Sequence, residues 1–135
     1  MSTFLLEIVT PERKVYAEQA NMIVVKGVEG ELGILPNHIP LVTPLRIAPI
    51  TVKKRGSKDV VIAVNGGFME VRKDKVVILA ESAELPEQID VERAQKAKER
   101  AQGRLSPAKQ DHVDFKRAEL ALQRALNRID VSGKK

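Results

Sequence analysis

Hydrophobic residues in the first two thirds of the chain come in short runs, which turn-forming residues divide at roughly strand-length intervals. This spacing is typical of an all-β sandwich or barrel. Valine and isoleucine dominate the runs, and their branched β-carbons favour strands over helices. The runs that we expect to form strands are Phe4–Val9, Lys14–Glu18, Met22–Val25, Ile47–Lys54, Val60–Val64, Phe68–Arg72 and Val76–Glu81.

Two glycine-containing stretches separate some of these runs. In Gly30–Val42, glycines and prolines interrupt the apolar residues at places that no helix tolerates, so we expect irregular, extended backbone. An irregular extended segment of this kind can connect two sheets and hold them together. Asn65-Gly66-Gly67 falls between two runs and predicts a hairpin turn with positive φ. The alternative is a phosphate-binding loop, but no Gly-Lys-Ser/Thr sequence follows it.

Beyond Leu85-Pro86 the hydrophobic period lengthens from about 2 to about 3.6 residues and alanine replaces valine, which indicates helices. Asp90 is a suitable N-cap for the first helix, and Gly103 and Ser106-Pro107 interrupt it. The second helix begins at Ser106 or after Asp111. The sequence thus predicts an all-β sandwich N-terminal domain over residues 1–85, followed by a C-terminal α-helical hairpin over residues 86–135.

The expected contact faces of the two helices are rich in alanine, which permits close antiparallel packing but offers little apolar area to bury. We therefore expect the hairpin to be weakly held and able to detach or straighten. The seam of the first helix is Ala94, Ala97, Ala101 and Leu105, and that of the second, which runs to about Ile129, is Phe115, Ala118, Leu122, Ala125 and Ile129.

Composition and the distribution of charge limit the possible classes of function. The net charge of +5 lies entirely in the last third, because residues 1–89 hold 11 basic and 11 acidic residues whereas residues 90–135 hold 12 and 7. A basic nucleic-acid-binding module is the alternative that this charge suggests, but Phe115 is the only aromatic residue there for base stacking. No run approaches the roughly 18 apolar residues of a membrane span, and a soluble protein is expected.

Chemistry-bearing residues are sparse. The chain has no cysteine, and His38 and His112 lie far apart without metal-ligand spacing. No nucleophile elbow or Walker-type loop is present. We therefore expect neither a catalytic site nor a metal site, and the chain should not be an enzyme by itself.

Arginines form a band beside each alanine seam. If the helices pack with both bands on one side, several guanidinium groups converge, and such groups repel one another unless an anion such as a phosphate lies between them. A solvated charged face is the other interpretation, and the spacing alone leaves both open. The bands are Arg93, Arg100 and Arg104 on the first helix and Arg117, Arg124 and Arg128 on the second.

Three sequence strings resemble one family. Gly-Glu-Leu-Gly-Ile-Leu-Pro-Asn-His-Ile-Pro-Leu at residues 30–41, Ile-Asp-Val-Glu-Arg-Ala at 89–94 and the stretch from Asp114 to Arg128 are similar to the epsilon subunit of the bacterial F-type, proton-translocating ATP synthase. The second string matches the Ile/Leu-Asp-x-x-Arg-Ala motif with which some of these subunits bind ATP on the folded helix pair. The ATP-binding residues that the resemblance implies are Glu84, Ile89, Asp90, Arg93, Ala94, Arg100, Arg124 and Arg128.

The resemblance implies a non-catalytic rotor subunit of the central stalk, which helps couple proton flow to ATP synthesis. Its sandwich would contact the gamma subunit and the c-ring, peripherally at the cytoplasmic face of the cell membrane. The hairpin would bind ATP as a regulatory ligand when folded, with no cofactor required. When extended it would meet the alpha and beta subunits and inhibit ATP hydrolysis. The sequence differs from that of many relatives at Gly103 and Ser106-Pro107, where those relatives have a more continuous helix.

Overall fold

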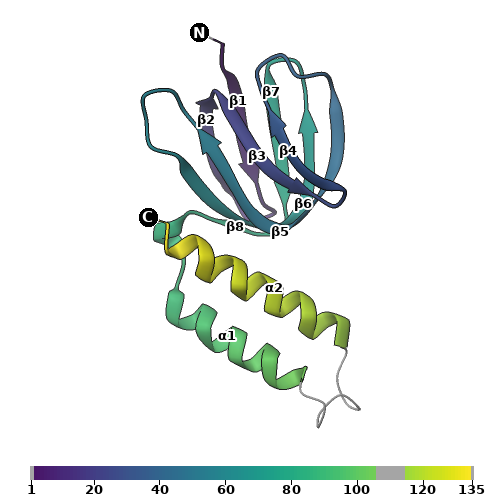
Figure 1. Cartoon of the computed structure of the whole chain (residues 1–135), viewed down its shortest axis with the longest axis vertical. Coiled ribbons are helices and arrows are strands. Elements are labelled where there is room, and N and C mark those ends of the chain that lie inside the picture. The colour runs from purple at the N-terminus through teal and green to yellow at the C-terminus, as the bar shows by residue number, and fades with distance from the viewer. Residues whose placement is uncertain (1, 106–114, 135) are drawn as a thin grey trace.

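The computed structural model describes residues 2–105 and 115–134. Within these residues the chain forms one mixed β-sheet that curves around a common interior, with two helices beneath it (Figure 1). The strand order is β2-β1-β7-β6-β5-β3-β4 with β8 beside β6, and β1 and β7 are the one parallel pair in this described part. The strands are β1 Phe4–Val9, β2 Lys14–Ala20, β3 Met22–Gly27, β4 Gly30–Ile34, β5 Leu41–Lys53, β6 Val60–Val71, β7 Lys75–Ala80 and β8 Ala83–Glu84.

The long strands β5 and β6 belong to both layers of the sandwich. The first half of β6 pairs with β8 and its second half with β7, while β5 follows it throughout. Gly66 and Gly67, with φ of 83° and 133°, stand where β6 changes partners. The predicted hairpin turn at Asn65-Gly66-Gly67 is therefore wrong, because positive φ here bends one continuous strand instead of reversing the chain.

The strands enclose one apolar core. Inward residues alternate along the strands, as Phe4, Leu6 and Ile8 do on β1, and all three are at most 2% exposed. The buried residues of this main core all come from the strands, and none from the helices. The predicted β-sandwich followed by helices is confirmed.

The segment Gly30–Val42 is more regular than predicted. Its first part, Gly30–Ile34, forms the edge strand β4, because its backbone pairs in register with β3. A turn with Asn37 at φ 64° then leads into β5. Ile34 is buried, whereas Leu35 and Ile39 are 56% and 75% exposed.

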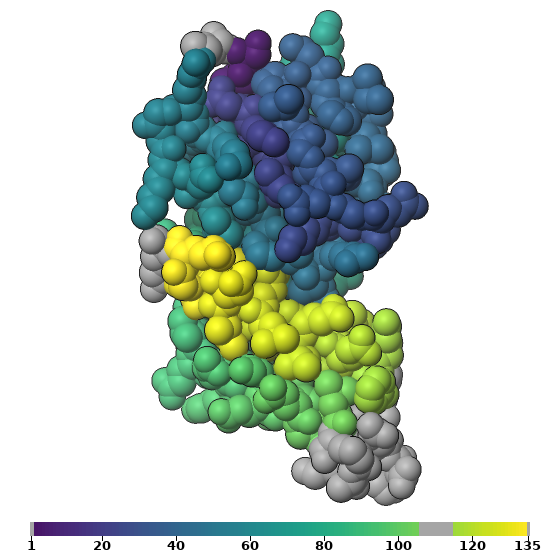
Figure 2. Space-filling model, viewed as in Figure 1, coloured from purple at the N-terminus to yellow at the C-terminus, as the bar shows by residue number. Residues whose placement is uncertain are grey.

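The helical region begins with the 3-10 turn η1, Pro86–Gln88, followed by α1, Val91–Arg104, and α2, Phe115–Ser132. Helix α1 continues through Gly103 instead of being interrupted there, and Ser106-Pro107, Asp111 and His112 lie outside the described residues. Helix α2 lies between α1 and the sandwich, and its last turns rest against the strands (Figure 2). No helix of the described residues is long and apolar enough to cross a membrane.

The predicted alanine seams form the contact between the helices. Ala94 and Ala101 on α1 are buried, as are Ala118 and Ala125 on α2. Phe115 at the start of the second seam is 49% exposed. Small side chains thus dominate the buried part of this contact, as expected for a hairpin held by limited apolar area.

Candidate anion-binding groove

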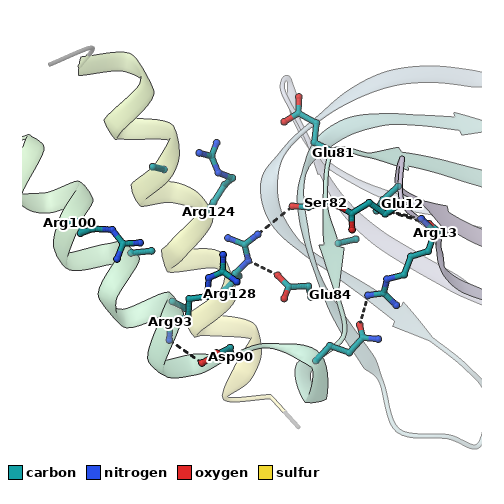
Figure 3. Close-up of a pocket in the computed structure, with 16 residues that line it drawn as sticks. Glu12, Arg13, Glu81, Ser82, Glu84, Asp90, Arg93, Arg100, Arg124 and Arg128 are labelled. Atoms are coloured by element: carbon teal, nitrogen blue, oxygen red, sulfur yellow. Dashed lines mark hydrogen bonds and ion pairs between the residues drawn. The ribbon is translucent and has the colours of Figure 1, made fainter.

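A cavity of about 600 Å³ lies between the two helices and the adjoining edge of the sandwich (Figure 3). We call it the arginine groove. Helix α1, helix α2, the β7–β8 region and the β1–β2 turn each contribute side chains to it. Its lining residues are Thr10, Glu12, Arg13, Glu81, Ser82, Ala83, Glu84, Gln88, Asp90, Arg93, Ala94, Ala97, Arg100, Ala121, Arg124 and Arg128.

Asp90 fixes the start of α1 at the edge of this groove. Its Oδ1 atom accepts a hydrogen bond of 3.0 Å from the backbone N–H of Arg93, so the predicted N-cap is confirmed. The cap holds Arg93 and Ala94 in the first turn of the helix, where they face the groove. The positive end of the helix dipole lies at the same place, and it favours an anion.

Four arginines from the two helices converge on the groove. Arg93 and Arg100 are two turns apart on α1, and Arg124 and Arg128 are one turn apart on α2, so each pair shares a helix face. Within the described part of the chain, no hydrogen bond or ion pair occupies the guanidinium groups of Arg93, Arg100 and Arg124. A groove with three such cations suits a multiply charged anion.

Arg128 differs from the other three because the sandwich already holds it. Its Nε atom pairs with Oε1 of Glu84, and its Nη2 atom lies 3.4 Å from Oγ of Ser82. Both side chains of the ion pair are about a quarter exposed, at 28% for Arg128 and 25% for Glu84. Glu84 therefore acts on the groove by orienting Arg128.

Of the residues that the sequence singled out for ATP, all but Ile89 line the groove. Ile89 is buried beneath it, in a small apolar cluster with Ala63 and Val131. Of the remaining arginines in the two bands, Arg104 lies at a separate shallow hollow with Glu99, Arg100 and Gly103, and Arg117 does not line the groove. The structure thus brings together four of the six arginines that the spacing grouped.

Apart from Glu84, the sequence did not indicate which residues of the sandwich line the groove. Arg13 and Glu12 reach the groove from the β1–β2 turn, and Nη2 of Arg13 lies 3.4 Å from Oε1 of Gln88. The same Oε1 atom accepts a 2.9 Å hydrogen bond from the backbone N–H of Leu85. Arg13 and Gln88 are 75 positions apart, and no sequence periodicity links residues at such a distance. Only the fold shows that the β1–β2 turn forms one side of the groove. No group of three metal-ligating side chains occurs among the described residues.

Comparisons with known proteins identify the class. The model of the "ATP synthase, Delta/Epsilon chain, beta-sandwich domain" matches residues 3–86. The model of the corresponding "long alpha-helix domain" matches residues 87–133. The chain therefore belongs to the delta/epsilon family of ATP synthase chains.

Within this family the relatives with high identity are bacterial epsilon chains. The ATP synthase epsilon chain of Halalkalibacterium halodurans is 60% identical over 134 residues, which cover 99% of this chain and 100% of the relative. That of Brevibacillus brevis is 61% identical over 132 residues, covering 98% and 99%. A chain in the cryo-EM structure of the Euglena gracilis mitochondrial ATP synthase (OSCP/F1/c-ring) superposes with a TM-score of 0.77 at 26% identity, covering 91% of this chain and 77% of that one.

Proposed function

We propose that the chain is a non-catalytic central-stalk subunit of an F-type ATP synthase, and that its folded hairpin binds ATP in the arginine groove. The observation that supports the ligand assignment is the convergence on one cavity of three guanidinium groups from two helices, Arg93, Arg100 and Arg124, for which the described part of the chain provides no ion-pair partner. The family supports the assignment to the complex.

The chemistry of the groove suits a triphosphate. A guanidinium group offers a planar fork of N–H donors that matches two phosphate oxygens, and such charge-assisted hydrogen bonds are stronger than neutral ones. Arg93 and Arg100 come from α1, whereas Arg124 and Arg128 come from α2. A phosphate chain between them neutralises their mutual repulsion, and it bridges the two helices.

Regulation follows from this bridge. Only a folded hairpin presents arginines of both helices to one phosphate chain, so ATP shifts the equilibrium toward the folded form. When ATP is scarce the basic helices extend toward the alpha and beta subunits, where they block ATP hydrolysis. An excess of basic residues after Asp90 gives the extended helices a charge that complements an acidic partner surface.

The sandwich offers a surface for the rest of the rotor. Pro44, Phe68 and Leu79 are directly paired across β5, β6 and β7, so their side chains share one face of the sheet. Phe68 and Leu79 are 55% and 56% exposed, and Val42 on the same face of β5 is 66% exposed. An exposed apolar patch of this kind marks a protein contact. We propose that this patch, with exposed Leu35 and Ile39, contacts the gamma subunit and the c-ring, and that the chain lies peripherally at the cytoplasmic face of the membrane.

Isothermal titration of the isolated chain with ATP tests the groove. Loss of one charged partner of a phosphate costs about 1.5 to 3 kcal/mol, so Arg93→Ala and Arg124→Ala should each weaken binding by roughly ten- to a hundredfold. Lys96→Ala is the matched control, because Lys96 is an exposed cation on α1 that does not line the groove. If both arginine variants bind ATP like the parent, the nucleotide site is not in this groove.

A basic nucleic-acid-binding module is the competing function. It predicts a salt-dependent shift of DNA in a gel assay, and it predicts that the shift is lost with the same arginines. An ATP-binding regulator predicts no DNA shift at physiological salt. Phe115 is the one aromatic residue among the described residues of the two helices, which favours the regulator, because proteins that bind single-stranded nucleic acids typically stack successive bases on several aromatic side chains.

A further inference from the structure

Helix α2 contacts the sandwich through one buried polar side chain. Asn127 is 5% exposed, and its Nδ2 atom donates to the backbone oxygen of Val64 at 3.1 Å and to Oδ1 of Asn65 at 3.2 Å. Val131, one turn further along α2, is buried against Ala63. The amide of Asn127 therefore lies in the buried contact of α2 with β6, where its hydrogen bonds to Val64 and Asn65 are shielded from water.

The hydrogen bonds continue from Asn65 toward the arginine groove. Nδ2 of Asn65 donates to Oγ of Ser82 at 2.9 Å, and the same Oγ atom accepts from Nη2 of Arg128 at 3.4 Å. Arg128 also pairs with Glu84 (Figure 3). The adjacent residues Asn127 and Arg128 thus hold two connected parts of the sandwich, Val64–Asn65 and Ser82–Glu84.

We propose that Asn127 is a positioning residue that docks α2 on the sandwich and thereby sets Arg128 in the arginine groove. The proposal rests on the function proposed above, and it adds the element through which ligand binding controls release of the hairpin. Asn127 does not line the groove, so it acts on the ligand only through the docked position of α2.

The physical reason lies in the two oxygens that Asn127 satisfies. In the docked state the backbone oxygen of Val64 and Oδ1 of Asn65 face α2, and a buried acceptor without a donor is costly. In the undocked state water reaches both of them. Loss of the Asn127 donor therefore penalises the docked state selectively. Because binding and docking are linked, a ligand that needs Arg128 in place binds more weakly in proportion to the fall in the docked fraction.

Asn127→Leu tests the proposal, since leucine has the branched shape of asparagine and removes its donor. Leucine is larger, and it also removes the buried Oδ1 of Asn127, which finds no hydrogen-bond partner among the described residues. The pH profile of Asn127→Asp therefore serves to separate the donor from packing. Gln95→Leu is the control, because Gln95 is an exposed amide on α1, away from the contact of α2 with the sandwich. The chain contains no cysteine, so spin labels on cysteines introduced at exposed Ser57 and Gln102 report the distance between the sandwich and α1. Calorimetry of ATP binding supplies the second readout.

We expect the parent and Gln95→Leu to show one short distance without ligand, and Asn127→Leu to add a population at longer distance. The affinity of Asn127→Leu for ATP should fall roughly tenfold, and saturating ATP should restore the short distance. Unchanged distances and unchanged affinity in Asn127→Leu would overturn the proposal. A parent that does not bind ATP would refute the proposed function, while the ligand-free distances would still decide the role of Asn127 in docking.

A pH profile separates the hydrogen bond from simple packing. In Asn127→Asp a carboxylate faces two oxygen acceptors and repels them, but burial raises its pKa, and its protonated form can donate. Docking of Asn127→Asp should therefore improve as the pH falls from about 7.5 to about 5, whereas docking of Asn127→Leu and Gln95→Glu should not change. Equal behaviour of Asn127→Asp at both pH values would contradict a donor role.

Discussion

Gly67 shows how a single residue sets the path of a strand. A β-carbon built on it would lie 2.1 Å from the backbone oxygen of Leu79, and its φ of 133° is strained for any other residue. Gly67→Ala should therefore cost at least about 3 kcal/mol in unfolding free energy, measured by urea denaturation. Gly56→Ala is the control, because Gly56 also has positive φ but nothing lies within 4 Å of its added β-carbon. Similar losses in the two variants would show that strain, not the close approach of β7, constrains Gly67.

Glu7 makes the stability of the sandwich depend on pH. Hydrogen bonds from Lys14 and then Lys75, opposed by desolvation, lower the pKa of Glu7 from 4.5 to about 2. A carboxylate with a lowered pKa stabilises the fold above its unfolded pKa, and this contribution disappears as the pH falls from about 4.5 to about 2. In urea titrations the parent should exceed Glu7→Gln in stability at pH 7, and the difference should vanish toward pH 2. The exposed Glu29→Gln variant should not show this convergence.

At the scale of elements, the start of α1 depends on Asp90. Asp90→Ala removes the hydrogen bond to the backbone N–H of Arg93, and loss of such a cap costs about 1 kcal/mol. The first turn should fray, which moves Arg93 away from the groove and weakens ATP binding. Hydrogen exchange at the first turn and calorimetry with ATP measure the two effects. Asp90→Ser, which restores a capping oxygen, should recover the protection of the first turn; a failure to do so would assign the effect to the charge of Asp90.

The elements also show what the sequence could predict. Some features depend only on residues that are close together in the sequence, so helical patterns were enough to predict them. These are the cap at Asp90, the alanine seams and the shared face of Arg124 and Arg128. The bend at Gly66-Gly67 was misread because a glycine pair between two apolar runs looks the same whether the chain reverses or continues. Only the pairing of β6 with both β7 and β8 distinguishes the two cases.

At the scale of the whole molecule, the polar contacts that the sequence did not indicate join the sandwich to the helical region. Arg13 reaches Gln88 across 75 residues, and Asn127 reaches Asn65 across 62. A polar residue such as Asn127 carries no signal of its own on a helix, because its burial depends on which surface the helix meets. The family resemblance indicated Arg93 and Arg124, which line the groove. It did not indicate the contact between α2 and the sandwich.

The separate core of the sandwich predicts the outcome of truncation. The buried residues of the main core end at Ala83, so a chain that stops after Glu87 keeps this core. It loses the packing of Ile89 and Val131 on Ala63 and the polar contacts that Gln88, Asn127 and Arg128 make with the sandwich. The truncated chain should keep its sheet signal in circular dichroism, because its apolar core remains intact.

Two functional readouts complete this experiment. Assembly of the truncated chain with the gamma subunit and the c-ring should survive, and inhibition of ATP hydrolysis should be lost with the helices. Phe68→Asp in the truncated chain should abolish assembly, since it places a charge in the exposed apolar patch of β6 without touching the core. Lys58→Asp, on the exposed turn before β6, makes a larger change of charge outside the patch and should leave assembly intact. Loss of the sheet signal on truncation would show that the hairpin is part of the folding unit, and continued inhibition by the truncated chain would move the regulatory element into the sandwich.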